Sequence, residues 1–306
     1  MQQRRIQSGV AGQPRASEVL VISGRAIQRS RVLGLIGVSG ALAGCIPGPS
    51  LSKSEIRSLE RLSYSIELAT KDNSQELFEV SALRAGEADA PRIIYIHGTP
   101  GDATNFADYI LDPIDGHESI AIDRPGFGRT APRTPVTSFE EQAKAVEPLL
   151  VERNGRWPIL VGHSLGGPIA ARVAADHPDR VGGIVILAGS LDPELENPRW
   201  FNHVAGVWPF SAAIGRTMRT SNHEIMAAVE ETRELDGVLS RVRCPVVIVH
   251  GTKDRLVPVA NVDYMRREFA HIDAVTVMII EDEGHFLPWS REELVRQSIT
   301  GVSAKR

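Results

Sequence analysis

A serine between two close glycines follows a short apolar run near the middle of the chain. Ser164 stands in the sequence Gly-His-Ser-Leu-Gly at 162–166, after the run 158–161 and before residues 168–175, whose composition predicts a helix. A strand that passes directly into a helix bends sharply, and side chains two residues before and after the bend would strike the backbone. The Ser164 hydroxyl would project there as a nucleophile, with the Leu165 amide facing an oxyanion. An ordinary glycine-rich turn would show the same five residues, so other stretches must decide.

Three further stretches carry chemically useful side chains directly after apolar runs. They are His97-Gly98-Thr99-Pro100-Gly101, the segment that contains Asp254, and the segment that contains His285. Residues that follow the strands of an open parallel sheet gather on one rim. A nucleophilic serine needs a base, which a near-neutral histidine provides, and that histidine needs a carboxylate to fix its tautomer. We favour Asp254 as this acid, with Asp192 and Glu194 as alternatives.

The elements that would position these residues alternate along the chain. Apolar runs recur at 92–96, 118–122, 158–161, 183–187, 245–249 and 275–280, mostly with helical segments between them. Continuous Val and Ile runs are typical of strands covered on both faces, so we expect an α/β fold with a mostly parallel central sheet flanked by helices. Upstream, alternating apolar and polar residues at 64–70 and 77–86 predict a hairpin. Ser138 and Glu141 predict a capped helix that runs to about residue 155.

From about Leu191 to Ser240 the sequence has no apolar run of the kind that predicts a strand, and this stretch predicts a small helical cap inserted into the domain. Its aromatic side chains would line a pocket or pack the cap onto the domain; they are Trp200, Phe201, Trp208 and Phe210.

These motifs together resemble the α/β-hydrolase family over roughly Arg92 to Trp289. The family features are the Gly-x-Ser-x-Gly turn, the His-Gly-x-Pro-Gly turn, and the stretches at 123–130, 250–258 and 284–289. The resemblance implies that Ser164 is the nucleophile, His285 the base and Asp254 its orienting acid. It also implies an oxyanion hole built from the backbone amides of Thr99 and Leu165. We expect the other histidines of these turns, which are His97, His163 and His250, to hold backbone. Asp123 and Arg124 would brace their loop, and Phe127 would approach the pocket.

Composition limits the classes of partner and cofactor. The chain has 306 residues, of which 42% are hydrophobic and 24% charged, with a formal net charge of −4. This balance is ordinary for a globular protein and argues against nucleic acid as a partner. The two cysteines, Cys45 and Cys244, and the scattered histidines show no metal-ligand spacing, so we expect no metal and no disulfide framework. We expect Cys244 to be a buried apolar side chain.

The first 44 residues have the order of a secretory signal peptide. A basic segment precedes the apolar run from Val32, which ends in Leu-Ala-Gly before Cys45. The run is shorter than the ~20 residues that a helix needs to span a bilayer. Its end resembles the lipobox of bacterial lipoproteins, which implies cleavage before Cys45 and lipidation of that cysteine. The basic part is long for such a leader, and a start at Val10, Val19 or Val21 would shorten it.

The predicted organisation is therefore a leader over 1–44, a tether over 45–60 and a hydrolase domain over 61–306. The protein would be anchored by lipid at the bacterial envelope. Ile46 after the cysteine favours the outer membrane; a cytoplasmic enzyme with an N-terminal arm is the alternative.

Serine at the turn indicates acyl transfer, because family members that open epoxides or displace halide use an aspartate there. We expect a serine hydrolase without metal or organic cofactor that acts on a small-molecule acyl substrate, with carboxylic esters favoured. The alternatives are hydrolysis of a C–C bond, an amide or a thioester, cofactor-free perhydrolysis, and a catalytically inactive binding module at the envelope. Reaction of the serine with a fluorophosphonate would distinguish an enzyme from a binding module.

Overall fold

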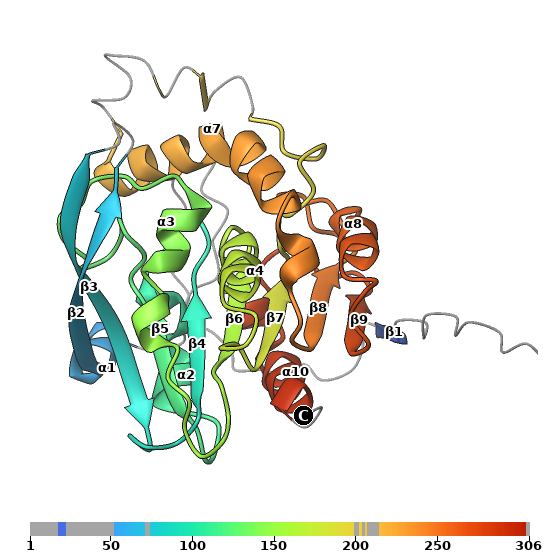
Figure 1. The fold of residues 1–306 in the computed structure, drawn as a ribbon, viewed down its shortest axis with the longest axis horizontal. Helices are drawn as coiled ribbons and strands as arrows, with labels where there is room; N and C mark the ends of the chain where they lie inside the picture. The colour runs from blue at the N-terminus through green and yellow to red at the C-terminus, as the bar shows by residue number, and fades with distance from the viewer. Residues whose placement is uncertain are drawn as a thin grey trace, which may run out of the picture.

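In the computed structural model the described residues are 18–22, 52–70, 74–198, 202–203, 206 and 214–303. Their strands form one sheet of nine, in the order β1-β9-β8-β7-β6-β4-β5-β3-β2. The strands are β1 (Glu18–Ile22), β2 (Glu60–Ala69), β3 (Gln75–Gly86), β4 (Arg92–Ile96), β5 (Glu118–Ile122), β6 (Ile159–His163), β7 (Gly183–Leu187), β8 (Val246–Gly251) and β9 (Val275–Ile280). In this spatial order, every neighbouring pair from β1 to β5 is parallel. Strand β3 pairs antiparallel with both β5 and β2. The expected α/β-hydrolase fold, with its mostly parallel sheet, is confirmed (Figure 1).

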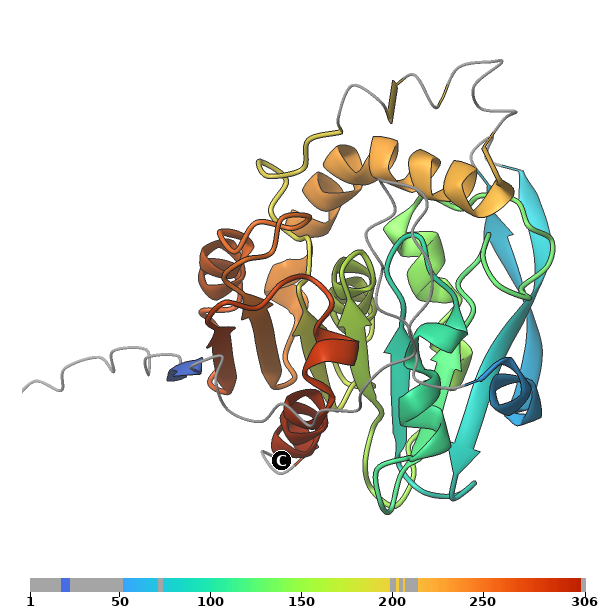
Figure 2. The ribbon, with the colours of Figure 1, turned by 180° about the vertical axis from the view of Figure 1, so that it is seen from behind.

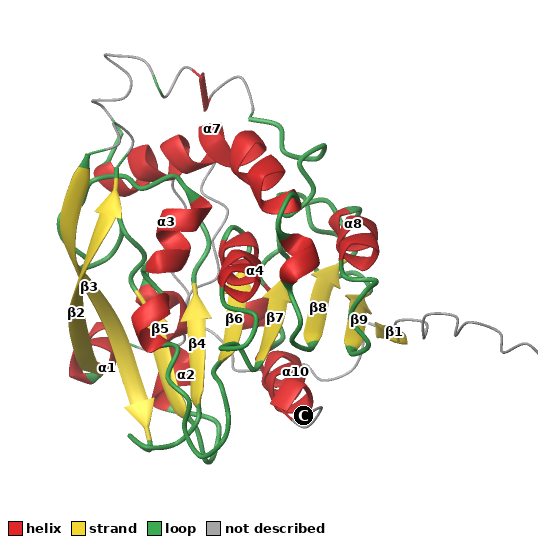
Figure 3. Ribbon diagram, viewed as in Figure 1, coloured by secondary structure: helices red, strands yellow, loops and turns green. Residues whose placement is uncertain are grey.

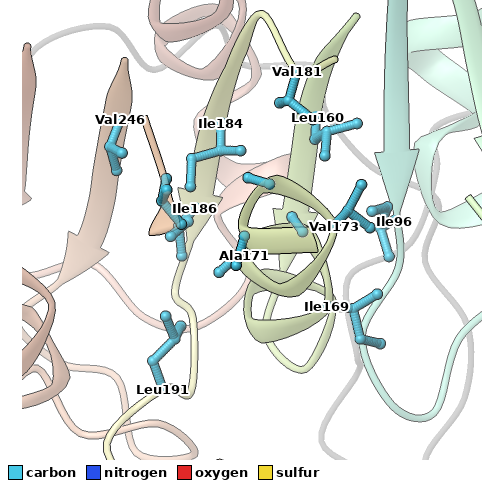
Figure 4. Packing of buried hydrophobic residues seen from close by; sticks show 14 of the residues in the cluster. Ile96, Leu160, Ile169, Ala171, Val173, Val181, Ile184, Ile186, Leu191 and Val246 are labelled. Carbon is cyan, nitrogen blue, oxygen red and sulfur yellow. The ribbon is translucent and has the colours of Figure 1, made fainter. Parts of the chain in front are cut away.

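Helices cover both faces of the sheet (Figure 3). One face packs against α3 (Phe139–Lys144), α4 (Gly166–Asp176) and α8 (Asn261–Glu268), and the other against α2 (Ala107–Leu111) and α10 (Glu292–Ser303). Successive strand residues alternate between the two cores: Ile184 and Ile186 of β7 belong to the first, and Val185 and Leu187 to the second. Because both faces are buried, the strands read as continuous apolar runs. Figure 4 shows the first core around α4, where Ala171 lies on the side of Ile186 and Val173 on the side of Ile96.

Shorter helical segments connect these elements. They are α1 (Lys53–Ser58), the 3₁₀ turns η1 (Ala103–Phe106), η2 (Glu147–Leu149) and η3 (Leu239–Arg241), and α9 (Leu287–Ser290). The view from behind shows α2, α9 and α10 on the second face (Figure 2). The hairpin of β2 and β3 forms as expected, with Tyr64 opposite Val80, and joins the sheet through β5.

The helix expected from Ser138 to residue 155 is shorter than the pattern indicates. Its start is confirmed, since the Ser138 hydroxyl accepts the Glu141 N–H at 3.4 Å. The helix α3 ends at Lys144, and η2 carries Pro148, which cannot continue a helix ladder. The Glu141 carboxylate does not close a capping box either: it accepts the N–H of Ala69 at 2.8 Å and so ties α3 to the hairpin.

Between β7 and β8 the long helix α7 (Arg216–Asp236) lies across the sheet at the end toward which β4 and β8 point (Figure 1). It occupies the C-terminal half of the stretch expected to form a cap. The aromatic residues expected to anchor that cap, Trp200, Phe201, Trp208 and Phe210, lie outside the described residues.

The strand β1 comes from the stretch predicted to be a leader. It pairs in parallel with β9, and the Glu281 N–H donates to the Ile22 carbonyl at 3.0 Å. Its exposed side chains include Val21, which is 63% accessible. Removal of residues 1–44 would leave β9 as the edge of the sheet. None of the helices within the described ranges is long and apolar enough to cross a membrane. The predicted leader and lipidation of Cys45 stay predictions, and Cys45 lies outside the described residues.

Candidate active site

The candidate site lies where the order of the parallel strands reverses. Strand β4 has β5 on one side and β6 on the other, so the connections from β4 and β6 leave in opposite directions. A crevice forms at such a point beyond the carboxyl ends of the strands. The residues that leave these two strands are His97 to Gly101 and Ser164.

Ser164 stands on a sharp turn between β6 and α4. Its φ is +54°, in the left-handed region that a residue with a side chain rarely adopts. A Cβ on Gly162 would collide with the Gly166 carbonyl, and a Cβ on Gly166 would collide with the Ile96 carbonyl. The two glycines therefore allow the turn, as expected from the sequence. The Ser164 N–H donates to the Leu187 carbonyl at 2.9 Å and fixes the bend against β7.

The turn after β4 packs directly against Ser164. A Cβ on Gly98 would lie 2.8 Å from the Ser164 Cβ and 3.3 Å from its Oγ. Within the described part of the chain, neither the Thr99 N–H nor the Leu165 N–H donates to an acceptor. These are the two amides expected to form an oxyanion hole, and Leu165 is the N-cap residue of α4, where backbone N–H groups and the helix dipole favour negative charge.

The structure brings His285 and Asp254 together. The His285 Nδ1 donates to the Asp254 Oδ2 over 2.7 Å, which leaves Nε2 as the proton acceptor. Asp254 also accepts the N–H groups of Leu256 and Val257 at 2.9 Å each. Burial alone would raise the pKa of the Asp254 carboxyl, but the hydrogen bond and charge of His285, with these two amides, lower it overall. The carboxylate is therefore ionised at neutral pH.

Among the described residues, neither Asp192 nor Glu194 is hydrogen-bonded to His285. The Asp192 Oδ1 accepts the N–H of Glu194 at 3.0 Å, and Asn261 holds the backbone N–H of Asp192 at 2.9 Å. The geometry therefore favours Asp254 as the partner of His285.

Three other histidines hold backbone around the site, as the sequence suggested, and one of them is His97, whose Nδ1 lies 2.7 Å from the Gly98 carbonyl oxygen. The His163 Nε2 donates to the His285 carbonyl at 2.9 Å, and the two rings lie 4.8 Å apart. Because His163 directly precedes Ser164, this contact holds the His285 loop beside the nucleophile. Burial, followed by the nearby His285, lowers the pKa of His163 to about 3, so it stays neutral. The His250 Nε2 donates to the Val257 carbonyl at 3.0 Å and supports the Asp254 turn.

The loop after β5 is braced as expected. Asp123 is fully buried and accepts the Arg61 guanidinium and the Ala103 N–H at 2.7 and 2.8 Å. Phe127 is also buried, and its ring lies against His97 and under Arg124.

Sequence reasoning missed Glu224, which is buried in α7 and pairs with Arg124. The two residues are 100 positions apart, so no local pattern joins them. A signal does exist in the helix: Glu224 shares a buried stripe with small and apolar residues at four-residue spacing, including Thr220, Ala228 and Thr232. Because an unpaired buried carboxylate is energetically costly, its position in such a stripe indicates a positively charged partner.

No cluster of three or more metal-ligating side chains occurs among the residues that the structure describes. One cavity of about 750 Å³ lies between the tip of the β2–β3 hairpin and α7, and its lining includes Gln75, Pro135 and His223. It contains none of the residues expected to be catalytic.

Comparison with known proteins places the fold. A family model described as "alpha/beta hydrolase fold" matches residues 91–214. The chain is 35% identical over 100 residues to the dihydrolipoyllysine-residue acetyltransferase component of the acetoin cleaving system of Cupriavidus necator, a match that covers 32% of this chain and 26% of that protein. It is 37% identical over 109 residues to an esterase of Mycobacterium tuberculosis, covering 35% of this chain and 36% of that protein. The matches thus span about a quarter to a third of these relatives.

Among solved structures, a putative lipase from Acinetobacter baumannii superposes with a TM-score of 0.60 at 18% identity, covering 85% of this chain and all (100%) of that one. At this identity the likeness shows the fold alone.

Proposed function

Because this chain has the α/β-hydrolase fold, we propose that it is a serine hydrolase that works through an acyl-enzyme on carboxylic esters. The observation that carries the proposal is the 2.7 Å hydrogen bond from His285 to Asp254, on the rim where Ser164 stands on its strained turn. A serine at this turn supports acyl transfer, whereas hydrolases of this fold that open epoxides or displace halide have an aspartate there.

In the proposed mechanism the Ser164 Oγ attacks the ester carbonyl carbon as its proton passes to the His285 Nε2. Asp254 holds the imidazole in the tautomer that can accept this proton and then stabilises the imidazolium. The tetrahedral oxyanion receives the N–H groups of Thr99 and Leu165. The intermediate then collapses: the ester C–O bond breaks, the imidazolium protonates the departing alkoxide oxygen, and Ser164 stays acylated. Water gives a proton to the same histidine as it attacks the acyl carbon, and the bond from this carbon to the Ser164 Oγ then breaks while the imidazolium protonates Oγ, which releases the acid and restores Ser164.

The ester preference is supported by the name of one relative, the esterase that is 37% identical to this chain over 109 residues. The test is a panel of p-nitrophenyl esters of increasing acyl length, run beside an anilide, a thioester and a vinylogous 1,5-diketone that reports C–C cleavage. We expect turnover of the esters, with one preferred acyl length. Ser164→Ala should lower kcat by about 10³-fold or more with the fold intact, since members of a triad act as a unit. Faster turnover of another bond type would reject the ester assignment and keep the acyl-enzyme.

We further propose that the protein is a lipid-anchored enzyme of the bacterial cell envelope. The support is the order of basic, apolar and small residues that ends at Cys45. Each buried CH₂ of a lipid contributes about 0.8 kcal/mol, and stable anchoring needs more than one chain, which bacterial lipoproteins carry. Cleavage before Cys45 would remove β1 together with the rest of the leader, so the lipidated mature protein would lack this strand.

A further inference from the structure

A buried ion pair joins helix α7 to the loop after β5. The side chains of Arg124 and Glu224 are 0% and 2% exposed. The Arg124 Nη1 donates to Glu224 Oε1 at 2.6 Å, and Nη2 donates to Oε2 at 3.1 Å. Apolar residues of similar volume often replace a buried ion pair at no cost in stability. The pair therefore needs an explanation other than the stability of the fold.

The remaining donors of Arg124 bind the turn that follows β4. Its Nε donates to the His97 carbonyl at 2.9 Å, and its Nη2 donates to the Gly98 carbonyl at 2.9 Å. His97 adds a second donor. Its Nε2 accepts the Arg124 N–H at 3.2 Å, so the ring proton is on Nδ1, which lies 2.7 Å from the Gly98 oxygen. Two donors from two side chains thus fix one carbonyl group.

The Gly98 carbonyl belongs to the same peptide unit as the Thr99 N–H. This peptide is trans and planar, so its C=O and N–H point in opposite directions. Whatever fixes the oxygen fixes the direction of the N–H as well. Gly98 itself packs against Ser164, and an oxyanion-hole donor is effective only when it is aimed beforehand at the position where charge develops.

We propose that Arg124 and Glu224 are positioning residues that connect helix α7 to the oxyanion hole. Glu224 orients the guanidinium, the guanidinium holds the Gly98 oxygen, and the Thr99 N–H is thereby aimed at the Ser164 site. This inference rests on the proposed function, in which that amide stabilises the oxyanion. The full catalytic rate would then require that α7 packs correctly against the loop after β5.

The first test is Glu224→Gln, which keeps the shape of the side chain and removes its charge. Since loss of one oxyanion donor lowers kcat by roughly 10²- to 10³-fold, a loosened donor should lower kcat by about 10- to 100-fold with KM changed by less than about twofold. Affinity for a trifluoromethyl ketone analogue, whose adduct carries the oxyanion, should fall in the same proportion.

The matched control is Glu118→Gln, at the opposite end of β5. Glu118 is equally buried and pairs with Arg92 and Arg153 at 2.7 and 2.6 Å, away from the candidate site. This variant should lose stability and keep kcat. A kcat for Glu224→Gln equal to that of the control would overturn the proposal.

A double variant, Arg124→Met with Glu224→Met, separates positioning from folding, since it leaves no unpaired charge. It should fold and share the low kcat. Crystal structures of Glu224→Gln and of the double variant would show the orientation of the Gly98–Thr99 peptide directly, and this measurement needs no knowledge of the substrate. A turned or doubled peptide supports the positioning role even if wild-type protein hydrolyses no ester, a result that would reject only the proposed function. An unchanged peptide in both variants would reject the positioning role.

Discussion

Buried neutral histidines should make the fold sensitive to mild acid. The pKa of His163 is lowered by burial and then by His285 to about 3, and burial followed by the charge of Arg124 holds the pKa of His97 well below its ordinary value. Burial also lowers the pKa of His250. In the unfolded chain each histidine titrates near ~6.5. The unfolded state therefore binds more protons below that pH, and stability is complete above ~6.5 and falls as the pH falls toward the folded pKa.

The magnitude follows from linkage. Between pH 7 and pH 5, protonation of one histidine in the unfolded state alone lowers the free energy of unfolding by about 2 kcal/mol. The result does not depend on the exact folded pKa as long as that value is well below 5. His97 and His250 act in the same direction, because burial lowers the pKa of each. The loss from His163 alone is a substantial part of the ~5–15 kcal/mol by which most domains are stable.

The assay is urea unfolding followed by circular dichroism at both pH values, for the wild type and His163→Gln. The glutamine amide can still donate toward the His285 carbonyl, but it does not titrate. The difference in free energy between the two pH values should be about 2 kcal/mol smaller in the variant. Trp289→Phe is the control: the Trp289 ring packs on His163 at 5.6 Å, so this change loosens the packing and keeps the titrating group. Equal pH differences in the wild type and His163→Gln would refute the reasoning.

Three further outcomes are expected. Asp254→Asn should lower kcat by roughly 10⁴-fold because the His285 tautomer is no longer fixed, and a stronger effect of Asp192→Asn in the same ester assay would show that the acid is misassigned. The kcat/KM of the wild type should be lower in acid than at neutral pH, since only neutral imidazole accepts the serine proton, and a flat profile from about pH 5 to 9 with chemistry rate-limiting would contradict this. Cys45→Ser should move the protein out of the membrane fraction, while a chain that begins at Pro47 stays active; an unmodified Cys45 with its leader attached, seen by mass spectrometry, would reject the anchor.

The strands of the sheet were predicted well from the sequence. Each parallel strand is buried on both faces, so its residues form a continuous apolar run that is easy to recognise. The predicted runs 183–187 and 245–249 correspond to β7 (Gly183–Leu187) and β8 (Val246–Gly251). The end of α3 was predicted too late because the apolar pattern continues past Lys144, although Pro148 is a local signal against a continued helix. The hydrogen bond from the Ala69 N–H to the Glu141 carboxylate joins residues 72 positions apart, and no local pattern indicates it. Propensity carries no information on such long-range contacts.

The candidate site was predictable as far as its residues follow strands, since the carboxyl ends of parallel strands must share a rim. Ser164, Asp254 and His285 all meet this condition. Glu224 does not, because a long connection brings it from α7 to Arg124, and only the buried stripe of its helix marks it. Topology therefore reveals the residues proposed to react, and packing reveals those proposed to position them.

The most direct test of the central claim is covalent trapping of the nucleophile. The folded wild-type protein is treated with a fluorophosphonate, and the intact mass and the modified peptide are measured beside Ser164→Ala. We predict one adduct per chain, located on Ser164; its formation should slow in acid, and the adduct should be absent from the variant. A correctly folded wild type that gains no adduct, or an adduct that persists in Ser164→Ala, would contradict it.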